Sequence, residues 1–489
     1  MITVALIGIG CGMYWLWRYL TARSDEPPFV PGAWPVLGHI PLLIGDSCKL
    51  WSGINELSNK SYDYGGVVAA RFGPRTVYIV TDPDDMLTIA NTCLEKDDFY
   101  KFAICWLGKG LITANVSVWK QHRKLLSPAF SQIVLDSFMG VFNSQSRKLV
   151  KDLEKEIGKG SFNHWTYTKN SALETICLTS LGVDFTESVL NSKYVEAIDV
   201  LFSTLVERFM KFWWHSRQTF KFSNLKKQRD ACLKILHNMS NTILQKRKSE
   251  FTGNVCAERN IIPGTRFKAF MDLLLELSLG KRVLTDKQIR EYVDTMIVGA
   301  YDTSANVLMF TLLLLGAHPD VQEKVVAEIK EVFGEEDRDV EKHELSRLMY
   351  LEAVIKESMR IHTIAPVVAR KIIKDVKLKN CTLSAGRTCF LFLFGLHRHP
   401  IWGPDRHQFK PERWLDPSQL PDNPNAFVAF SIGRRMCIGK AYAYMSLKTS
   451  LVHLLRRYRI NANDSELRLK LDVMLKPDSG YYISIEKRT

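Results

Sequence analysis

A cysteine in a glycine- and arginine-rich loop stands out as a chemical group in this chain of 489 residues. The loop spans residues 430–439, reads FSIGRRMCIG, and places Cys437 just before an apolar stretch that predicts a helix from Ile438 onward. A helix N-terminus offers unpaired N–H groups and a positive dipole, which both favour a thiolate over a thiol. Gly433 lets the backbone approach a flat partner closely, and Arg435 adds a cation suited to a carboxylate on that partner. The alternative is a free cysteine in an ordinary loop.

A second polar group interrupts a long apolar segment. Residues 299–304 read GAYDTS, so that Asp302 and Thr303 fall in the middle of a predicted apolar helix. Burying an acid among apolar side chains costs free energy, so an acid at this position indicates a functional role. The structural alternative is a threonine bonded back to its own helix and an aspartate in a surface salt bridge.

The elements that position these groups are mostly helical. A capping box at residues 285–288 predicts the start of the long apolar helix, which we expect to end near Leu315. Pro319 then predicts the first turn of another helix that ends before Gly334. Short strands are expected at residues 67–72, 77–81, 367–373 and 481–485. This pattern predicts a mostly α fold with small β-sheets.

Residues 430–439 resemble the haem-binding signature of the cytochrome P-450 haem-thiolate monooxygenases. Three further motifs of that family occur in the expected order: WKQHR at 119–123, ESMR at 357–360 and PERW at 411–414. The resemblance covers essentially the whole chain. It implies the cytochrome P-450 fold, mostly α with small β-sheets, with an N-terminal transmembrane helix as in the microsomal forms.

The resemblance also implies a role for single residues around haem b, iron protoporphyrin IX. Cys437 is the expected axial thiolate ligand, in a loop shaped by Phe430 and Gly433. The expected partners of the haem propionates are Arg435, Trp119, Arg123 and Arg370. Thr303 is expected to hydrogen-bond the activated oxygen and Asp302 to relay protons to it. A buried ion-pair network is expected from Glu357, Arg360 and Arg413.

Two positions depart from the family pattern. Ala300 replaces the usual glycine two places before the acid. Gly299 stands where many fatty-acid ω-hydroxylases carry a glutamate that esterifies the haem, so we expect non-covalent haem. Residues 106–111 and 123–130 still resemble that broad group, notably its insect members. The substrate itself, a small hydrophobic molecule, is not specified by the sequence.

The N-terminal residues predict attachment to a membrane. Residues 1–17 carry no charge and end in the aromatic cluster YWLW, and the first positive charges, Arg18 and Arg23, follow it. A signal peptide would carry positive charge before the apolar run instead. The prediction is therefore an anchor at 1–22, a proline-rich hinge at 23–42 and a haem-binding catalytic domain at 43–489. The positive-inside rule predicts a domain facing the cytosol, on the endoplasmic reticulum membrane.

Composition limits the partners. The net charge of +14 favours an acidic partner, and no nucleic-acid-binding motif accompanies it, so we expect no nucleic acid. Ten cysteines without CxxC pairs predict a reducing compartment and no structural zinc. The resemblance implies NADPH–cytochrome reductase as electron donor, with cytochrome b5 as a second candidate. The basic side chains expected on the docking face are Lys120, His122, Lys124, Arg434 and Lys440.

Three classes of function follow. The first is a membrane-bound monooxygenase that inserts one atom of dioxygen into a hydrophobic substrate with electrons from NADPH. The second is a haem-thiolate enzyme that isomerises or dehydrates peroxides without a reductase. The third is a non-catalytic carrier of hydrophobic ligands. The intact Asp302–Thr303 pair favours the first.

Overall fold

A computed structural model describes residues 25–182, 192–253, 269–281 and 284–488, together with Gly8, Gly10 and Gly12. The predicted anchor at residues 1–22 lies, apart from these glycines, outside the described residues. Within the described part, the helix long and apolar enough to cross a membrane is α13 (Asp286–Ala317), and most of it is buried inside the protein. A mostly apolar helix that is buried in this way forms the centre of a core.

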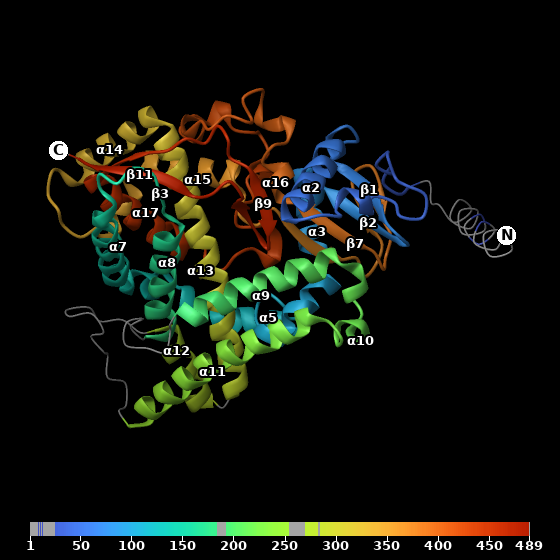
Figure 1. The fold of residues 1–489 in the computed structure, drawn as a ribbon, viewed down its shortest axis with the longest axis horizontal. Coiled ribbons are helices and arrows are strands. Elements are labelled where there is room, and N and C mark those ends of the chain that lie inside the picture. Colours follow the sequence, from blue (N-terminus) through green and yellow to red (C-terminus); the bar gives the residue numbers. More distant parts are fainter. Residues whose placement is uncertain are drawn as a thin grey trace.

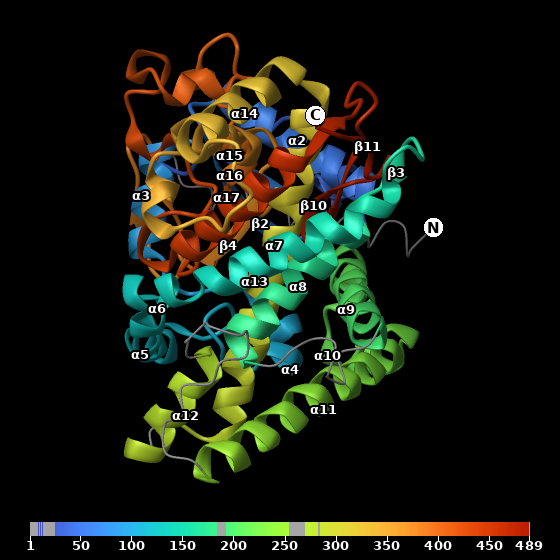
Figure 2. The ribbon, with the colours of Figure 1, turned by 90° about the vertical axis from the view of Figure 1, so that its left-hand side faces the viewer.

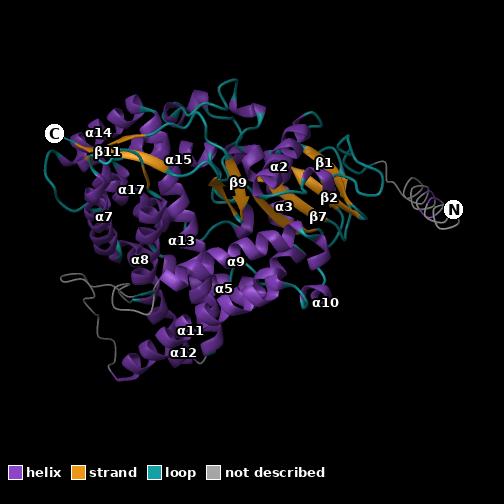
Figure 3. Cartoon of the chain, viewed as in Figure 1, coloured by secondary structure: helices purple, strands orange, loops and turns teal. Residues whose placement is uncertain are grey.

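Helices make up most of the molecule, as the sequence predicts, and fill the end away from the main sheet (Figures 1 and 3). The helices α9 and α11 lie side by side along one face, and α13 runs through the middle of the body (Figures 1 and 2). The helices are α2 (Ser47–Tyr62), α3 (Pro83–Thr92), α4 (Ile104–Leu107), α5 (Val116–Leu126), α6 (Gln132–Ser137), α7 (Met139–Leu153), α8 (Trp165–Leu181), α9 (Ser192–Met210), α10 (Arg217–Phe220), α11 (Asn224–Gly253), α12 (Phe270–Lys281), α13, α14 (Pro319–Phe333), α15 (Met349–Ile361), α16 (Leu393–Leu396) and α17 (Lys440–Arg457).

The strands form small sheets. The largest has the order β1-β2-β7-β4, in which β2 and β7 are parallel and the other neighbours are antiparallel. The other sheets in the described part are the hairpin of β9 and β10, the pair of β5 and β6 and the three-stranded sheet β3-β11-β8. The strands are β1 (Val67–Phe72), β2 (Arg75–Val80), β3 (Phe162–Asn163), β4 (Val367–Lys371), β5 (Val376–Lys377), β6 (Thr382–Leu383), β7 (Thr388–Phe392), β8 (Tyr458–Asn461), β9 (Leu469–Asp472), β10 (Met474–Pro477) and β11 (Tyr482–Lys487).

The predicted start of α13 is confirmed in atomic detail. The Gln288 N–H donates to Thr285 Oγ1 at 3.3 Å, and the Thr285 N–H donates to Gln288 Oε1 at 2.9 Å, which completes the capping box. The helix ends at Ala317, and α14 begins at Pro319 and ends before Gly334, as expected. Both ends of the central helix are thus set by local sequence.

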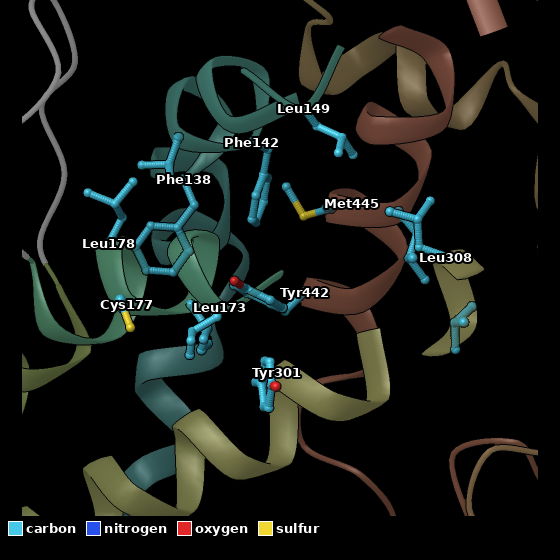
Figure 4. Close-up of a cluster of buried hydrophobic side chains, with 14 of the residues drawn as sticks. Phe138, Phe142, Leu149, Leu173, Cys177, Leu178, Tyr301, Leu308, Tyr442 and Met445 are labelled. Atoms are coloured by element: carbon cyan, nitrogen blue, oxygen red, sulfur yellow. The ribbon is translucent and has the colours of Figure 1, made fainter. Parts of the chain in front are cut away.

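The main core joins α7, α8, α13 and α17. Figure 4 shows Tyr442 of α17 directed toward Phe138 and Phe142, with Tyr301 of α13 facing the same cluster. The Tyr442 ring meets the Phe142 ring edge-on at 5.2 Å, and its hydroxyl lies 3.1 Å from Thr179 Oγ1. This packing fixes α17, and with it the cysteine loop that precedes α17, relative to α13.

Candidate active site

The cysteine loop ends in a tight turn before α17. The Cys437 N–H donates to the Phe430 carbonyl oxygen at 2.9 Å, which closes the loop on itself. The helix begins at Lys440 rather than at Ile438, because Gly439 takes the N-cap position. Cys437 therefore precedes the helix by three residues rather than one, and the predicted helix start at Ile438 is wrong by two residues.

The Cys437 side chain stays accessible although protein surrounds it closely. Desolvation raises the pKa of its thiol, whereas the Gly439 N–H and the charge of Arg123 lower it. Backbone N–H groups that favour the thiolate were predicted from the sequence, whereas the desolvation was not. A cation that binds this sulfur must displace its proton, as in other thiolate metal sites.

Gly433 has a structural reason besides the predicted one. Its φ is +72°, and a Cβ added there would meet backbone atoms of Ala90 in α3 at 2.9 Å. The glycine thus lets the cysteine loop lie directly against α3, and its close approach to a flat ligand stays a prediction.

Two buried guanidinium groups lie beside this loop. The Arg435 guanidinium lies 4.7 Å from the centre of the Trp119 ring, and its Nη2 donates to the Ala114 carbonyl oxygen at 2.8 Å. Its Nε and Nη1 find no hydrogen-bond partner among the described residues. Arg370 is 1% exposed, and in the same part of the chain its Nε also lacks a partner. Burial, reinforced by the charge of Arg370, lowers the pKa of Arg435 to about 10.

This cluster fits a dicarboxylate. Buried guanidinium groups without an anion are costly, and paired N–H groups match the geometry of a carboxylate. The propionates of a haem whose iron faced Cys437 would supply such anions. The structure thus brings together three of the predicted propionate partners, Arg435, Arg370 and Trp119.

Arg123 takes a different position from that group. Its Nη1 donates to the Met436 carbonyl oxygen at 3.0 Å, next to Cys437. It shares one face of α5 with Trp119, as their spacing predicts. Its contact with a propionate stays a prediction.

The hydroxyl of α13 behaves as the structural alternative predicts, whereas the acid does not. Thr303 Oγ1 donates to the Gly299 carbonyl oxygen at 2.6 Å. Asp302 is fully buried, and Lys476 Nζ of β10 lies 3.1 Å from its Oδ1. The salt bridge is therefore internal rather than on the surface. A buried ion pair at the centre of a core helix is expensive without further stabilisation, so a functional reason for it is favoured.

Comparison with known proteins decides the family. A model of the family described as Cytochrome P450 matches residues 27–485. The chain belongs to this family. It is 32% identical over 473 residues to human Cytochrome P450 4V2, which covers 94% of this chain and 90% of the human protein. It is 31% identical to Cytochrome P450 4c3 of Drosophila melanogaster, with 94% and 89% covered, and to Cytochrome P450 4c21 of Blattella germanica, with 94% and 93% covered. The chain is thus a haem monooxygenase with relatives in insects.

The predicted buried ion network of this cytochrome P450 is confirmed. Glu357 Oε1 lies 2.7 Å from Arg360 Nη2 and 3.0 Å from Arg413 Nε, and Trp414 Nε1 donates to Glu357 Oε2 at 2.9 Å. Arg413 also contacts Asp405 at 3.2 Å. The network ties α15 to the segment that precedes the cysteine loop, so its role is structural.

One cation beside the guanidinium groups of this cytochrome P450 was not predicted from the sequence. The backbone of Lys96 bridges that of Arg370, and burial together with the charges of Arg370 and Arg435 holds the Lys96 pKa well below its usual range. Its Nζ lies 4.3 Å from the centre of the Tyr100 ring. Lys96 sits in a run of mixed charge that carries no local signal. Only the folded chain shows that it joins the guanidinium cluster.

One predicted member of the docking face is wrong. His122 is buried, and its ring meets that of Tyr292 edge-on at 4.9 Å. Burial lowers the pKa of His122, so it adds no charge to the surface. The other four side chains of that prediction are exposed: Lys120, Lys124, Arg434 and Lys440.

Proposed function

We propose that this cytochrome P450 inserts one oxygen atom from dioxygen into a small hydrophobic substrate, with electrons from NADPH delivered by cytochrome reductase. The observation that carries this proposal is the pairing of an accessible Cys437 with the buried guanidinium groups of Arg435 and Arg370, which keep N–H groups without a hydrogen-bond partner among the described residues. Bound haem b would supply the activation of dioxygen. Because Gly299 has no carboxylate, the haem is non-covalent.

The residues of the chain have separate tasks in this proposal. Cys437 would hold the haem iron through its thiolate, within the loop that is closed by the Phe430 carbonyl oxygen and packed on α3 through Gly433. Arg435, Arg370, Trp119 and Arg123 would hold and orient the propionates, and Lys96 would join them. Thr303 and Asp302 of α13 would hold and transfer protons.

Electron delivery needs an acidic protein to dock near Cys437. Lys120, Lys124, Arg434 and Lys440 are exposed on segments that flank the cysteine loop. Opposite charge steers such encounters and makes them depend on ionic strength. The donor is NADPH–cytochrome reductase, and cytochrome b5 is a second donor of the same charge type.

Attachment to the endoplasmic reticulum membrane is supported by exposed apolar side chains. Trp34 is 62% exposed, and Phe222 beyond α10 is 89% exposed. Phe212 and Trp213, in the turn after α9, are exposed as well. Large apolar side chains gathered in this way mark membrane or protein contacts.

These side chains lie at the same end of the molecule. His215 follows the exposed turn after α9, and the charge of Arg75 at the start of β2 contributes to lowering its pKa, after the larger effect of burial. Arg75 pairs with Phe72 across the β1–β2 turn, and the backbone of Gly38 bridges both Phe72 and Trp34. We define these exposed apolar residues as the apolar end: Trp34, Phe212, Trp213 and Phe222.

The test is turnover by the full-length protein reconstituted with haem, reductase and NADPH in lipid, with a panel of hydrophobic substrates and isotopically labelled dioxygen. The proposal predicts one labelled oxygen atom in the product for each NADPH used productively. Product made from an organic hydroperoxide, without NADPH, would instead identify a peroxide isomerase or dehydratase. Haem or ligand binding without any turnover would identify a carrier.

A further inference from the structure

The buried ion pair of Asp302 continues toward solvent through the β9–β10 hairpin. Lys476 of β10 is 6% exposed, and its Nζ lies 3.1 Å from Asp302 Oδ1 and 4.0 Å from Asp472 Oδ2. Asp472 ends β9, and its side chain is 23% exposed. The three ionisable groups thus form a chain that leads from the centre of α13 to the surface.

Aromatic side chains wall this path. Lys476 Nζ lies 5.4 Å from the centre of the Trp165 ring and 5.7 Å from that of Phe202. The Trp165 ring stacks on Tyr481 at 5.2 Å. Rings on several sides keep bulk water away from the ammonium group while leaving it oriented toward the two carboxylates.

The cluster carries more carboxylates than its ammonium group can neutralise. Burial raises the pKa of Asp302 and of Asp472. Although burial opposes it, the two carboxylates raise the pKa of Lys476. Apart from the Lys476 contact, the Asp302 carboxylate has no hydrogen-bond partner among the residues that the structure describes. Such a cluster retains a proton that it can pass on.

We propose that Lys476 and Asp472 form the outer half of a proton path that reprotonates Asp302 during oxygen activation. The proposal rests on the proposed monooxygenase function. Asp302 gives its proton toward Thr303, and the Lys476 ammonium then protonates the Asp302 carboxylate. The neutral Lys476 amine takes a proton from the Asp472 carboxyl, and a hydronium ion from solvent then protonates the Asp472 carboxylate and leaves as water. Each step moves one proton and no electron.

Other charged groups also face Asp302. Asp199 of α9 forms an ion pair with Lys169 of α8, and its charge reaches Asp302, Asp472 and Lys476. Because Asp199 already forms an ion pair with Lys169, we assign the path to Asp472. The charge of Lys470 lowers the pKa of Asp472, and the hydroxyls of Tyr301 and Tyr481 also lie near the cluster.

The first readout needs no turnover. The infrared carbonyl band of protonated Asp302, identified by its loss in Asp302→Asn, is followed against pH in folded protein. The proposal predicts that Lys476→Met shifts the titration of this band to higher pH and that Lys476→Arg restores it. An unchanged titration in Lys476→Met would overturn the proposal, because Lys476 would then exchange no proton or charge with Asp302.

The second readout is coupling of NADPH to product in the haem-loaded enzyme. Asp472→Asn keeps the Asp302–Lys476 pair, so we expect normal haem content but about tenfold less product and a larger solvent deuterium isotope effect, as for loss of a positioned proton donor. The matched control is Asp478→Asn, whose carboxylate pairs with Lys470 at 3.5 Å on the same hairpin. Wild-type coupling and isotope effect in Asp472→Asn would overturn the proposal. So would an effect found in Asp199→Asn but not in Asp472→Asn.

Failure of the proposed function gives a different pattern. In that case the wild-type protein itself forms no product with NADPH and reductase, whereas the infrared titration still reports whether Lys476 controls the proton on Asp302.

Discussion

Arg370 lies close enough to Arg435 and Lys96 for its charge to lower the pKa of both, and this repulsion opposes folding of the protein without an anion. Binding of a dicarboxylate to the folded chain removes this repulsion, so haem binding and stability are linked. Arg370 and Arg435 were predicted from their motifs. Lys96 was not, since no spacing along the sequence connects it to them.

The buried carboxyl group of Asp294 gives a prediction about how the stability of the protein depends on pH. It is 1% exposed on α13, accepts a hydrogen bond from the Ser240 hydroxyl, and has Arg290 Nε at 3.8 Å. Burial raises its pKa from 3.8 to about 7. Between these two values the folded protein keeps a proton that the unfolded chain has released, so the free energy of unfolding falls as pH rises through this window.

Asp294→Asn imitates the protonated acid, so it removes this decrease in the free energy of unfolding with pH. We expect the free energy of unfolding of the variant minus that of the wild type to increase by about 2–3 kcal/mol from about pH 5 to pH 8. Denaturant unfolding at the two pH values measures the difference, with Asp286→Asn at the exposed start of the same helix as control. A stability difference that does not depend on pH would show that Asp294 is ionised throughout.

At the scale of helices and strands, the ends of elements that local residues determine were predicted from the sequence. The capping box at Thr285 and the proline at Pro319 gave the limits of α13 and α14. The strands β1, β2, β4 and β11 also fall within about two residues of the prediction. Cys437 was misplaced relative to α17 because a glycine N-cap leaves a turn between the cysteine and the helix.

Strands whose position depends on residues far away in the sequence were not predicted. The β9–β10 hairpin alternates charged and apolar residues, and nothing in it marks Lys476 as the partner of Asp302. Likewise, β7 lies in a continuous apolar run, which does not distinguish a strand from a helix. The candidate site was therefore predictable as a set of motif residues, whereas its charge pairs required the fold.

At the scale of the whole molecule, the apolar end predicts how the protein meets a membrane. The fluorescence of Trp213 is the difference between the wild type and Trp213→Phe. In full-length protein in lipid bilayers, brominated lipids should quench this difference. Trp402 is buried, so brominated lipids should not quench the corresponding difference between the wild type and Trp402→Phe. Equal accessibility of Trp213 to a water-soluble quencher with and without lipid would place this end of the molecule in solvent.

The central claim, that Cys437 holds haem iron as a thiolate, is tested most directly by the absorption spectrum of the reduced, carbon monoxide-treated protein. Cys105→Ala serves as the control, because Cys105 is also exposed but lies outside the cysteine loop. We predict a strongly red-shifted Soret band in the wild type and in Cys105→Ala, and its loss in folded Cys437→Ala. The same band in Cys437→Ala, or a band typical of imidazole ligation in the wild type, would contradict the account.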